Sequence, residues 1–471
     1  MLLANILWNL TIVPSTDFSS LSLSNAFLNN LEQLGYIKMT PIQAQSLPHL
    51  LNKKDLIGKA KTGSGKTVAF GIALLSKIQP TDYSVQALVL CPTRELADQV
   101  SKEIRKLARH TNNIKLLTLC GGMPFGPQLS SLEHPPHIVV GTPGRLQEHL
   151  RKGSLKLNKV STLVLDEADR MLDMGFLADI TDIIEQTNND RQTLLFSATF
   201  PDSIKQMSTN IQASPIEVSV EDSHQSNIKQ LFFDTPPSQR DKTLLAILND
   251  YQPKSTVIFC NTKRSTQEVA DMLRQQGHHA LAIHGDLEQR ERDQVLVRFA
   301  NHSCAILVAT DVAARGLDID DLQAVINYEI SRDPEVYIHR IGRTGRAGKK
   351  GLALNLCGPD DEHKISDIEA YQQINVELIS SDTLQPQPTI PLTGSMTTLQ
   401  IDGGRKQKIR PGDILGALTG ETGIEGKYVG KINIFDRWSY VAVHNSQANR
   451  ALKKLGAGKI KGKNFRIRKL R

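Results

Sequence analysis

Two short stretches of the chain carry residues that can bind phosphate and magnesium. AKTGSGKT (60–67) has glycines that let backbone N–H groups close around phosphate oxygens. In the same stretch Lys66 can place a charge at the β and γ phosphates, and the Thr67 hydroxyl can ligate Mg²⁺. The general phosphate-loop pattern begins with glycine, whereas this chain has Ala60. The stretch by itself is therefore an imperfect match to a phosphate loop.

The second stretch is DEAD (166–169), which follows an apolar run. Asp166 is placed to hold Mg²⁺, and Glu167 to accept a proton from an attacking water. An acidic run at the start of a helix can also be a simple N-terminal cap. Because a phosphate loop lies upstream, the pair predicts a site that hydrolyses a nucleoside triphosphate.

Two further stretches contain side chains suited to a nucleotide. In GYIKMTPIQ (35–43), Gln43 can pair with adenine N6 and N7, and Tyr36 or the upstream Phe18 can stack on a base. Taken singly, each of these side chains is more typical of core packing. HRIGRTGR (339–346) places Arg340, Arg343 and Arg346 at three-residue spacing, which indicates arginine fingers for phosphoryl transfer. A solvated basic face and an ion-pair cluster that binds no phosphate are the alternatives.

The elements that must position these residues are predicted from repeated apolar runs that end in polar motifs. Runs of this kind without polar alternation are typical of strands buried on both faces, and hence of parallel sheets flanked by helices. Ligands bind such sheets at the carboxyl ends of the strands, where the motifs lie. The runs, each given with the polar motif that ends it, include 87–96, 137–145, 162–170, 193–199, 256–264, 305–316 and 324–329.

Breaks in this alternation predict the domain organisation. A leader (1–17) precedes a first α/β domain (18–213), a polar linker (214–225) and a second α/β domain (226–379). A proline-containing linker (380–396) is predicted to be an extended tether, and 397–471 to be a small separate domain. The apolar leader lacks the basic region of a secretory signal and is too short to span a bilayer; it is interpreted as a packed or frayed segment, or as a start placed too early.

Charge is concentrated at the C-terminus. The whole chain has a formal net charge of +7, and residues 397–471 hold 17 Lys and Arg against 5 Asp and Glu, so that segment is net positive by 12 and the rest is net negative by 5. This asymmetry predicts a polyanion-binding unit, with a merely solvated basic surface as the alternative. The five cysteines are scattered without a C-x-x-C pair, which predicts reduced, mostly buried thiols in a cytoplasmic protein and no zinc site.

The ordered motifs resemble those of DEAD-box RNA helicases of superfamily 2, from about Phe18 to about Leu378. GYIKMTPIQ resembles the family's Q motif, and AKTGSGKT is similar to the family's own phosphate loop, which has alanine first. PTREL, GG (121–122), TPGR (142–145), DEAD, SAT (197–199), FCNT, ATDVAARGLD (309–318) and HRIGRTGR follow in the family's order.

The resemblance implies an α/β fold, with two RecA-like parallel-sheet domains in tandem that close on ATP, Mg²⁺ and single-stranded RNA. Catalysis would involve Glu167, Lys66 and the arginine fingers Arg343 and Arg346. The implied ATP contacts are Phe18, Tyr36, Gln43, Lys61, Thr62, Gly63, Ser64, Gly65, Lys66, Thr67 and Asp318, with Thr67 and Asp166 on the metal. Ser197 and Thr199 would couple the nucleotide state to closure. The implied RNA backbone track consists of Pro92, Thr93, Arg94, Gly121, Gly122, Thr142, Gly144, Arg145, Thr310 and Asp311.

The C-terminal domain reads as a small α+β unit of the RNA-recognition-motif (RRM) type, with the order β-α-β-β-α-β. The expected strands are 398–401, 431–434, 439–443 and 464–470, and the expected helices are 411–420 and 446–455. DRWSYVAV (436–443) loosely resembles an RNA-stacking motif, with Trp438 and Tyr440 at its stacking positions. Plain packing of Tyr440 is an equally good interpretation.

Two glycine-rich basic stretches in this domain, 403–420 and 458–463, resemble the C-terminal domain of one bacterial DEAD-box subfamily. That resemblance implies that Arg405, Lys406, Lys408, Lys461 and Lys463 bind a hairpin of 23S ribosomal RNA during large-subunit (50S) assembly. The implied activity is local unwinding of short RNA duplexes. The alternatives are a general RNA helicase of cold shock or mRNA turnover, and an ATP-dependent RNA clamp; a DNA helicase or a transporter is disfavoured by the Q motif, SAT and the terminal domain.

Overall fold

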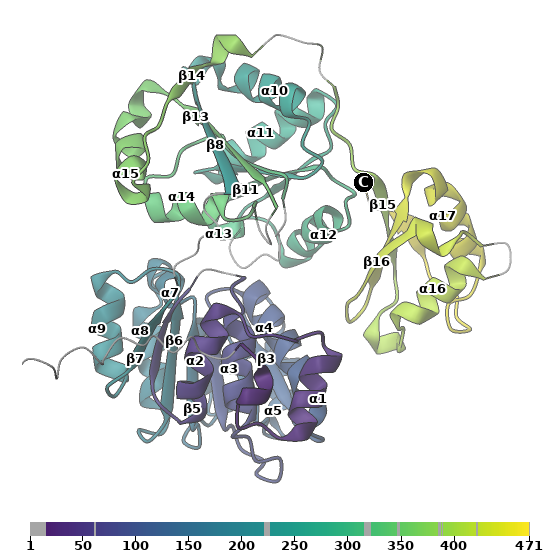
Figure 1. Cartoon of the computed structure of the whole chain (residues 1–471). Coiled ribbons are helices and arrows are strands. Elements are labelled where there is room, and N and C mark those ends of the chain that lie inside the picture. Colours follow the sequence, from purple (N-terminus) through teal and green to yellow (C-terminus); the bar gives the residue numbers. More distant parts are fainter. Residues whose placement is uncertain are drawn as a thin grey trace, which may run out of the picture. The chain divides into compact units, whose positions relative to one another are not determined.

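The computed structural model describes residues 16–60, 63–220, 227–314, 322–345, 349–384, 388, 390–420 and 423–470. The chain forms two compact units, Met1–Asp222 and Ser223–Arg471. Each unit contains a seven-stranded parallel sheet, and the second also contains a four-stranded antiparallel sheet (Figure 1). This architecture confirms the predicted fold class.

The sheet of the first unit has the strand order β3-β4-β2-β5-β6-β1-β7, with all neighbours parallel. Its central strands consist almost wholly of buried residues, as expected for a sheet covered on both faces. The strands are β1 (Leu56–Lys59), β2 (Ala87–Leu90), β3 (Leu116–Leu119), β4 (Ile138–Gly141), β5 (Thr162–Asp166), β6 (Gln192–Ser197) and β7 (Ile216–Ser219).

Helices cover both faces of this sheet and enclose two separate cores (Figure 1). One core lies beneath α1 (Asn25–Gln33), α2 (Pro41–Leu51), α3 (Lys66–Leu75) and α4 (Arg94–Leu107). The other includes α6 (Pro143–Arg151), α7 (Ala168–Asp173), α8 (Leu177–Glu185) and α9 (Asp202–Ile211), with α5 (Phe125–Leu132) at its margin.

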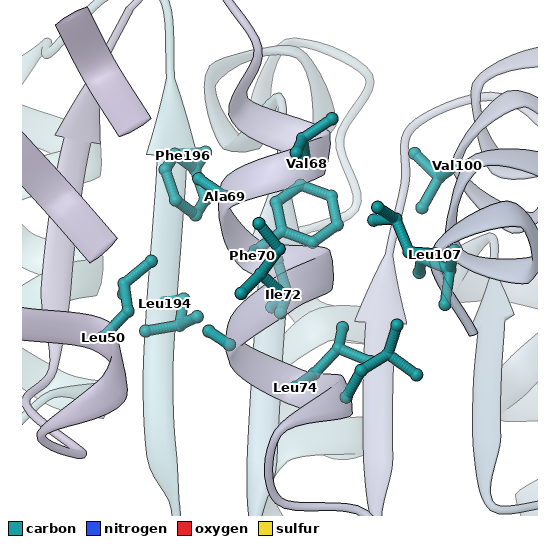
Figure 2. Close-up of a cluster of buried hydrophobic side chains, with 14 of the residues drawn as sticks. Leu50, Val68, Ala69, Phe70, Ile72, Leu74, Val100, Leu107, Leu194 and Phe196 are labelled. Atoms are coloured by element: carbon teal, nitrogen blue, oxygen red, sulfur yellow. The ribbon is translucent and has the colours of Figure 1, made fainter. Parts of the chain in front are cut away.

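Alternation along each strand divides the side chains between the two cores. On β2, for example, Val89 joins the first core while Leu88 and Leu90 join the second. Helix α3 is apolar all round and packs against α2 and α4 as well as the sheet. Figure 2 shows its Phe70 and Ile72 among side chains from neighbouring elements, including Leu194 and Phe196 of β6. This packing holds the N-terminus of α3, and therefore the phosphate loop, at the carboxyl edge of the sheet.

The sheet of the second unit has the order β10-β11-β9-β12-β13-β8-β14, again parallel throughout. Its strands are β8 (Ile228–Asp234), β9 (Thr256–Cys260), β10 (Ala280–Ile283), β11 (Ile306–Thr310), β12 (Ala324–Asn327), β13 (Gly351–Cys357) and β14 (Leu378–Ser380). One face is covered by α10 (Arg240–Tyr251) and α11 (Lys263–Gln275). The other is covered by α12 (Gln289–Ala300), α13 (Asp311–Ala314), α14 (Pro334–Ile341) and α15 (Glu362–Gln372).

The C-terminal domain has the predicted β-α-β-β-α-β order and the sheet order β16-β17-β15-β18. Its elements are β15 (Met396–Ile401), α16 (Pro411–Thr419), β16 (Val429–Ile434), β17 (Ser439–His444), α17 (Ala448–Ala457) and β18 (Ile467–Lys469). Pro411 begins α16 and Gly420 follows its last residue, as the sequence predicts. The two helices pack on one face of the sheet around Leu399, Val441 and Leu455.

Short 3₁₀ helices connect several of these elements. They are η1 (Phe18–Ser20), η2 (Ala108–His110), η4 (Pro237–Gln239), η5 (Pro359–Asp361), η6 (Ser381–Thr383), η7 (Arg405–Gln407), η8 (Gly426–Tyr428) and η9 (Asn445–Gln447). Among the described residues, no helix combines the length and apolar character needed to cross a membrane. All five cysteines are buried and unpaired, as predicted.

Two segments predicted as linkers are more ordered than expected. β7 lies inside 214–225 and pairs with β1, so this part of the predicted linker belongs to the first sheet. As an edge strand with one buried residue, β7 lacks the apolar signature of the central strands. In the second segment, the described residues near Leu392 lie against the second α/β domain: the Leu392 N–H donates to His278 Nδ1 at 3.0 Å, and Leu392 is buried. The expected tether is thus partly docked.

Candidate nucleotide and RNA sites

The phosphate loop has the conformation that its glycines require. Gly63 and Gly65 have φ values of 85° and 97°, and α3 begins immediately afterwards at Lys66. The Lys66 ammonium is buried and donates to the carbonyl oxygen of Ala60 at 2.6 Å. The Ser64 hydroxyl is buried and has no partner among the described residues. Lys61 and Thr62 lie outside the described residues, and Thr67 occupies the first turn of α3.

Gln43 is held between the Q motif and this loop. Its side chain is 2% exposed; Oε1 accepts from the Thr40 backbone N–H at 2.9 Å, and Nε2 donates to the Gly65 carbonyl oxygen at 3.0 Å. The amide therefore caps the start of α2 and also anchors the phosphate loop. Its oxygen has a second lone pair and its nitrogen a second hydrogen, so both atoms can still bond a base edge.

The two aromatic residues predicted to stack on a base take part in packing. Phe18 is 4% exposed and belongs to the core beneath α1 to α4. The Tyr36 hydroxyl donates to Glu103 on α4, and burial together with this carboxylate raises the pKa of Tyr36. Stacking by either ring stays a prediction.

The acidic pair of DEAD lies at the end of β5. Burial raises the pKa of Asp166 to about 7, and Lys66 acts in the opposite direction. Asp166 Oδ1 is buried without a partner among the described residues, which suits an oxygen ligand of a hard cation such as Mg²⁺. Glu167 is buried and has φ of 54°, a left-handed conformation that is unusual for a side chain of this kind and is typical of strained functional positions.

The sequence-based assignment missed Asp169, although it is part of the quoted DEAD stretch. Its Oδ2 accepts from both the N–H and the hydroxyl of Thr199, at 3.1 and 3.0 Å, and its N–H lies 3.3 Å from the Ser197 hydroxyl. The N–H of Ala60 in turn donates to the Ser197 carbonyl oxygen at 3.1 Å. Of the two predicted coupling residues, Ser197 is thus bonded to both the acidic motif and the phosphate loop, and Thr199 is bonded to the acidic motif.

Sheet order separates the motifs of the first unit into two groups. β5, β6 and β1 are neighbours, and their carboxyl ends carry DEAD, SAT and the phosphate loop. β3, β4 and β2 are neighbours, and their carboxyl ends lead into GG, TPGR and PTREL. The predicted nucleotide and RNA residues therefore occupy adjacent halves of one sheet edge.

The predicted RNA residues of the first unit cluster at helix starts and loops. Pro92 and Thr93 come directly before α4, and Arg94 begins that helix. Thr142 comes directly before α6, and Gly144 lies in the first turn of that helix. Gly121 and Gly144 face open space, and Gly122 has φ of 71°. Arg145 donates to the Met123 carbonyl oxygen at 3.0 Å and pairs with Glu148, so it fixes the GG loop against α6.

In the second unit, Thr310 and Asp311 lie where β11 ends, and the three predicted arginines have different environments. Arg340 is 2% exposed and bonds Asp311, whereas Arg343 follows α14 and is half-buried. The structure therefore does not place these two arginines on one exposed face. Arg346 and Asp318 lie outside the described residues.

The C-terminal domain brings its two basic stretches together. Lys461 Nζ donates to the Lys408 carbonyl oxygen at 2.8 Å, although the two residues lie far apart in the chain. Arg405, Lys406, Lys408, Lys461 and Lys463 are all exposed, and we call this set the basic surface. Gly404 supports the turn beneath it, because a Cβ there would lie 2.2 Å from the Phe435 carbonyl oxygen.

The sheet face that holds Tyr440, for which the sequence leaves stacking and packing open, is covered. Tyr440 is fully buried, and on the neighbouring strand Thr398 and Gln400 are 1% exposed. Thr398 Oγ1 lies 2.7 Å from the Ser303 hydroxyl of the preceding α/β domain, and the Arg290 guanidinium lies 5.1 Å from the Trp438 ring centre. This arrangement leaves no room for a base on Tyr440 and favours its packing interpretation.

Comparison with known proteins gives three consecutive matches. Residues 40–207 match the DEAD/DEAH box helicase family, 239–348 the helicase conserved C-terminal domain, and 398–469 the DbpA RNA binding domain. Among solved structures, S. cerevisiae Dbp5 bound to RNA and ADP BeF3 has a TM-score of 0.71 at 30% identity, covering 78% of this chain and 96% of that one. Mss116p bound to ssRNA and AMP-PNP has a TM-score of 0.68 at 28% identity, covering 76% and 77%.

The two parallel sheets with these motifs at their carboxyl edges, together with the matches, define an enzyme: the chain belongs to the DEAD-box family of ATP-dependent RNA helicases. Within that family it is 52% identical to the ATP-dependent RNA helicase DbpA of Escherichia coli K12, over 97% of this chain and 100% of the relative. The DEAD-box ATP-dependent RNA helicase CshA of Bacillus cereus is 43% identical over 78% of this chain and 70% of its own length. The alignment with DbpA covers more of this chain than the alignment with CshA does, and it includes the C-terminal domain that matches the DbpA RNA binding domain.

Proposed function

We propose that this helicase unwinds short RNA duplexes locally and is directed by its C-terminal domain to a hairpin of 23S ribosomal RNA, during assembly of the large ribosomal subunit in the cytoplasm. The observation that carries the proposal is the basic surface, where two sequence-distant stretches meet within a domain that matches the DbpA RNA binding domain. A basic surface built by folding, rather than a charged tail, can present its donors in a fixed pattern to one RNA shape.

Residues of both α/β domains supply the hydrolytic chemistry in this proposal. Lys66 leaves the Ala60 carbonyl to bind the β and γ phosphates, and Glu167 accepts a proton from the attacking water. Thr67 and Asp166 would hold Mg²⁺, which offsets the negative charge of the phosphates when it is bound. Arg343 and Arg346 would stabilise charge on the transferred phosphoryl group, and Asp318 would bind the ribose.

The RNA track of the core is proposed to read only phosphate and sugar. Its members are largely backbone N–H groups at helix starts, glycines and hydroxyls, which carry no base pattern. Thr310 and Asp311 are proposed to continue this track in the second α/β domain. A core of this kind binds any single strand, so the choice of RNA must come from elsewhere in the chain.

The C-terminal domain is the part of the chain suited to make that choice. Because its sheet face packs against Ser303, Arg290 and their neighbours, the RNA is proposed to bind the basic surface instead. This packing also supports a fixed distance between the gripped hairpin and the second α/β domain. The duplex that is unwound would then be one lying near the hairpin.

The test compares ATP hydrolysis by the full-length protein with the ribosomal hairpin and with an unrelated hairpin of equal length. We expect stronger stimulation by the ribosomal hairpin. Lys406→Gln and Lys463→Gln should each weaken binding and lower the salt dependence by about one charge, while a base-reading residue would cost about 1–3 kcal/mol on the ribosomal hairpin alone. Lys453→Gln, at an exposed lysine of α17 in the same domain, is the matched control.

Equal stimulation by both hairpins would contradict the proposal. The protein would then be a general RNA helicase whose C-terminal domain binds any RNA through its positive charge. ATP-dependent binding of both hairpins without strand separation would instead favour the clamp.

A further inference from the structure

Arg340 and Arg343 are three residues apart, yet only Arg340 is buried. Arg340 lies in the last turn of α14 and is 2% exposed, whereas Arg343 lies beyond the helix end at Ile341 and is half-buried. Arg340 therefore points into the second α/β domain and has no access to a nucleotide phosphate in this conformation. Arg340 can therefore act only through the groups that it contacts.

Every N–H of the Arg340 guanidinium is used. Nε donates to Asp311 Oδ1 at 2.6 Å, and Nη2 donates to Asp311 Oδ2 at 2.7 Å, which makes a two-point pair with that carboxylate. Nη1 donates to Asn327 Oδ1 at 3.0 Å and to the Glu329 carbonyl oxygen at 2.7 Å. Nη2 also donates to Asn261 Oδ1 at 2.8 Å. A guanidinium has five N–H donors, so this one is saturated.

These partners follow three neighbouring strands. Asp311 follows β11, Asn261 follows β9, and Asn327 ends β12, in the sheet order β11-β9-β12. One buried cation thus ties three strand ends together at the carboxyl edge of the sheet. The same edge includes Thr310, a residue of the proposed RNA track.

The pairing has an electrostatic consequence for RNA. The Asp311 side chain is 23% exposed, so a negative charge lies at the surface of an edge proposed to bind a phosphate backbone. An unpaired carboxylate there would repel the polyanion, and that repulsion would be strongest at low salt. The two bonds from Arg340 neutralise the carboxylate and hold it in one orientation.

We propose that Arg340 is a positioning residue for RNA binding, which neutralises and orients Asp311, and that it is not an arginine finger. This inference rests on the proposed RNA track of the core. It does not depend on the choice of ribosomal RNA, so a single-stranded RNA oligonucleotide of arbitrary sequence is the suitable probe. If the protein does not prefer the ribosomal hairpin, the results expected below for the Arg340 variants stay the same.

The test uses four full-length variants: Arg340→Gln, Asp311→Asn, the double variant that combines them, and Arg343→Gln. For Arg340→Gln we expect the RNA concentration that gives half-maximal ATPase stimulation to rise about 10-fold, with turnover at saturating RNA within about threefold of normal. Its salt dependence of RNA binding should fall by about one charge, because one carboxylate is uncovered. Nucleotide affinity without RNA should not change.

The double variant separates charge from packing. Removing the uncovered carboxylate should return half-saturation to within about threefold of the unmutated protein, since the repulsive charge is gone. Asp311→Asn alone should weaken RNA binding less than Arg340→Gln does, because it leaves no uncovered carboxylate at this edge. Arg343→Gln should behave in the opposite way to Arg340→Gln: turnover at saturating RNA should fall, and the RNA concentration that gives half-maximal stimulation should not change.

Arg340→Lys keeps the proposal testable if Arg340→Gln does not fold, as judged by thermal melting. Lysine keeps the charge but cannot make the two-point pair, so the salt dependence should stay normal while half-saturation rises. The inference is overturned if either Arg340 variant loses turnover with normal half-saturation, as a finger would. It is also overturned if the double variant binds RNA no better than Arg340→Gln.

Discussion

Gln43→Glu would test whether Gln43 reads adenine or only caps a helix. The substitution keeps the shape of the side chain and the oxygen that accepts from Thr40. It replaces the Nε2 donor with an oxygen that faces the Gly65 carbonyl oxygen at the former bond distance of 3.0 Å. It also removes the donor proposed for adenine N7.

The expected cost follows from burial. Gln43 is 2% exposed, but its bond to the Gly65 carbonyl oxygen is only partly buried, so water can replace part of the lost interaction. Leaving a buried acceptor unsatisfied costs about 1–3 kcal/mol, and we expect a cost at the lower end of that range. Loss of the adenine contact should add a rise of about 10-fold to 100-fold in KM for ATP, with tenfold equal to about 1.4 kcal/mol.

A pH dependence should accompany the change. Burial disfavours the charged form, so the pKa of the introduced glutamate should lie above its value in the unfolded chain. The protonated carboxyl can donate to the Gly65 carbonyl oxygen, whereas the ionised form cannot. The variant should therefore be closest to the unmutated protein at low pH, and it should lose stability as the pH rises through the raised pKa.

The assay measures RNA-stimulated hydrolysis of ATP and GTP, together with thermal melting at several pH values. Gln86→Glu is the matched control, because Gln86 is also buried, its Oε1 accepts from the Gln79 backbone N–H, and its Nε2 donates to the carbonyl oxygens of Gln79 and Asp82. It should lose stability with an unchanged KM for ATP. If Gln43→Glu melts at a lower temperature but keeps a normal KM for ATP, Gln43 is a capping residue only.

Three further results are expected. Glu167→Gln should bind ATP and RNA but hydrolyse ATP about 10²-fold more slowly or worse, because the proton acceptor is lost; near-normal single-turnover hydrolysis would remove Glu167 from the mechanism. Tyr440→Leu should lower the melting temperature while leaving hairpin affinity within about twofold, whereas a stacking residue would cost about 1–3 kcal/mol of affinity in a binding titration. Gly404→Ala should disrupt the turn beneath the basic surface, since its Cβ would meet the Phe435 backbone at 2.2 Å, and hairpin binding should fall in a titration while Gly412→Ala, which faces open space, binds normally.

The sequence alone was sufficient for the parts of the protein that local chemistry controls. Uninterrupted apolar runs predicted the buried central strands, because a strand covered on both faces needs apolar residues at every position. Pro411 and Gly420 predicted the ends of α16 by their backbone preferences. β7 was missed because an edge strand with one buried residue has no such pattern.

Other features were decided only by tertiary structure. The alternation of motifs along the chain does not reveal that β5, β6 and β1 gather the predicted nucleotide residues while β3, β4 and β2 gather the predicted RNA residues, since sheet order depends on which strands pair. Equal spacing likewise treated Arg340 and Arg343 alike, and the pattern in β17 left Tyr440 open to stacking or packing. Spacing determines where a side chain lies on its own helix or strand, but whether that side is buried depends on elements distant in the sequence. Arg340 is buried against Asp311 and Asn261, and Tyr440 lies on a sheet face that is covered.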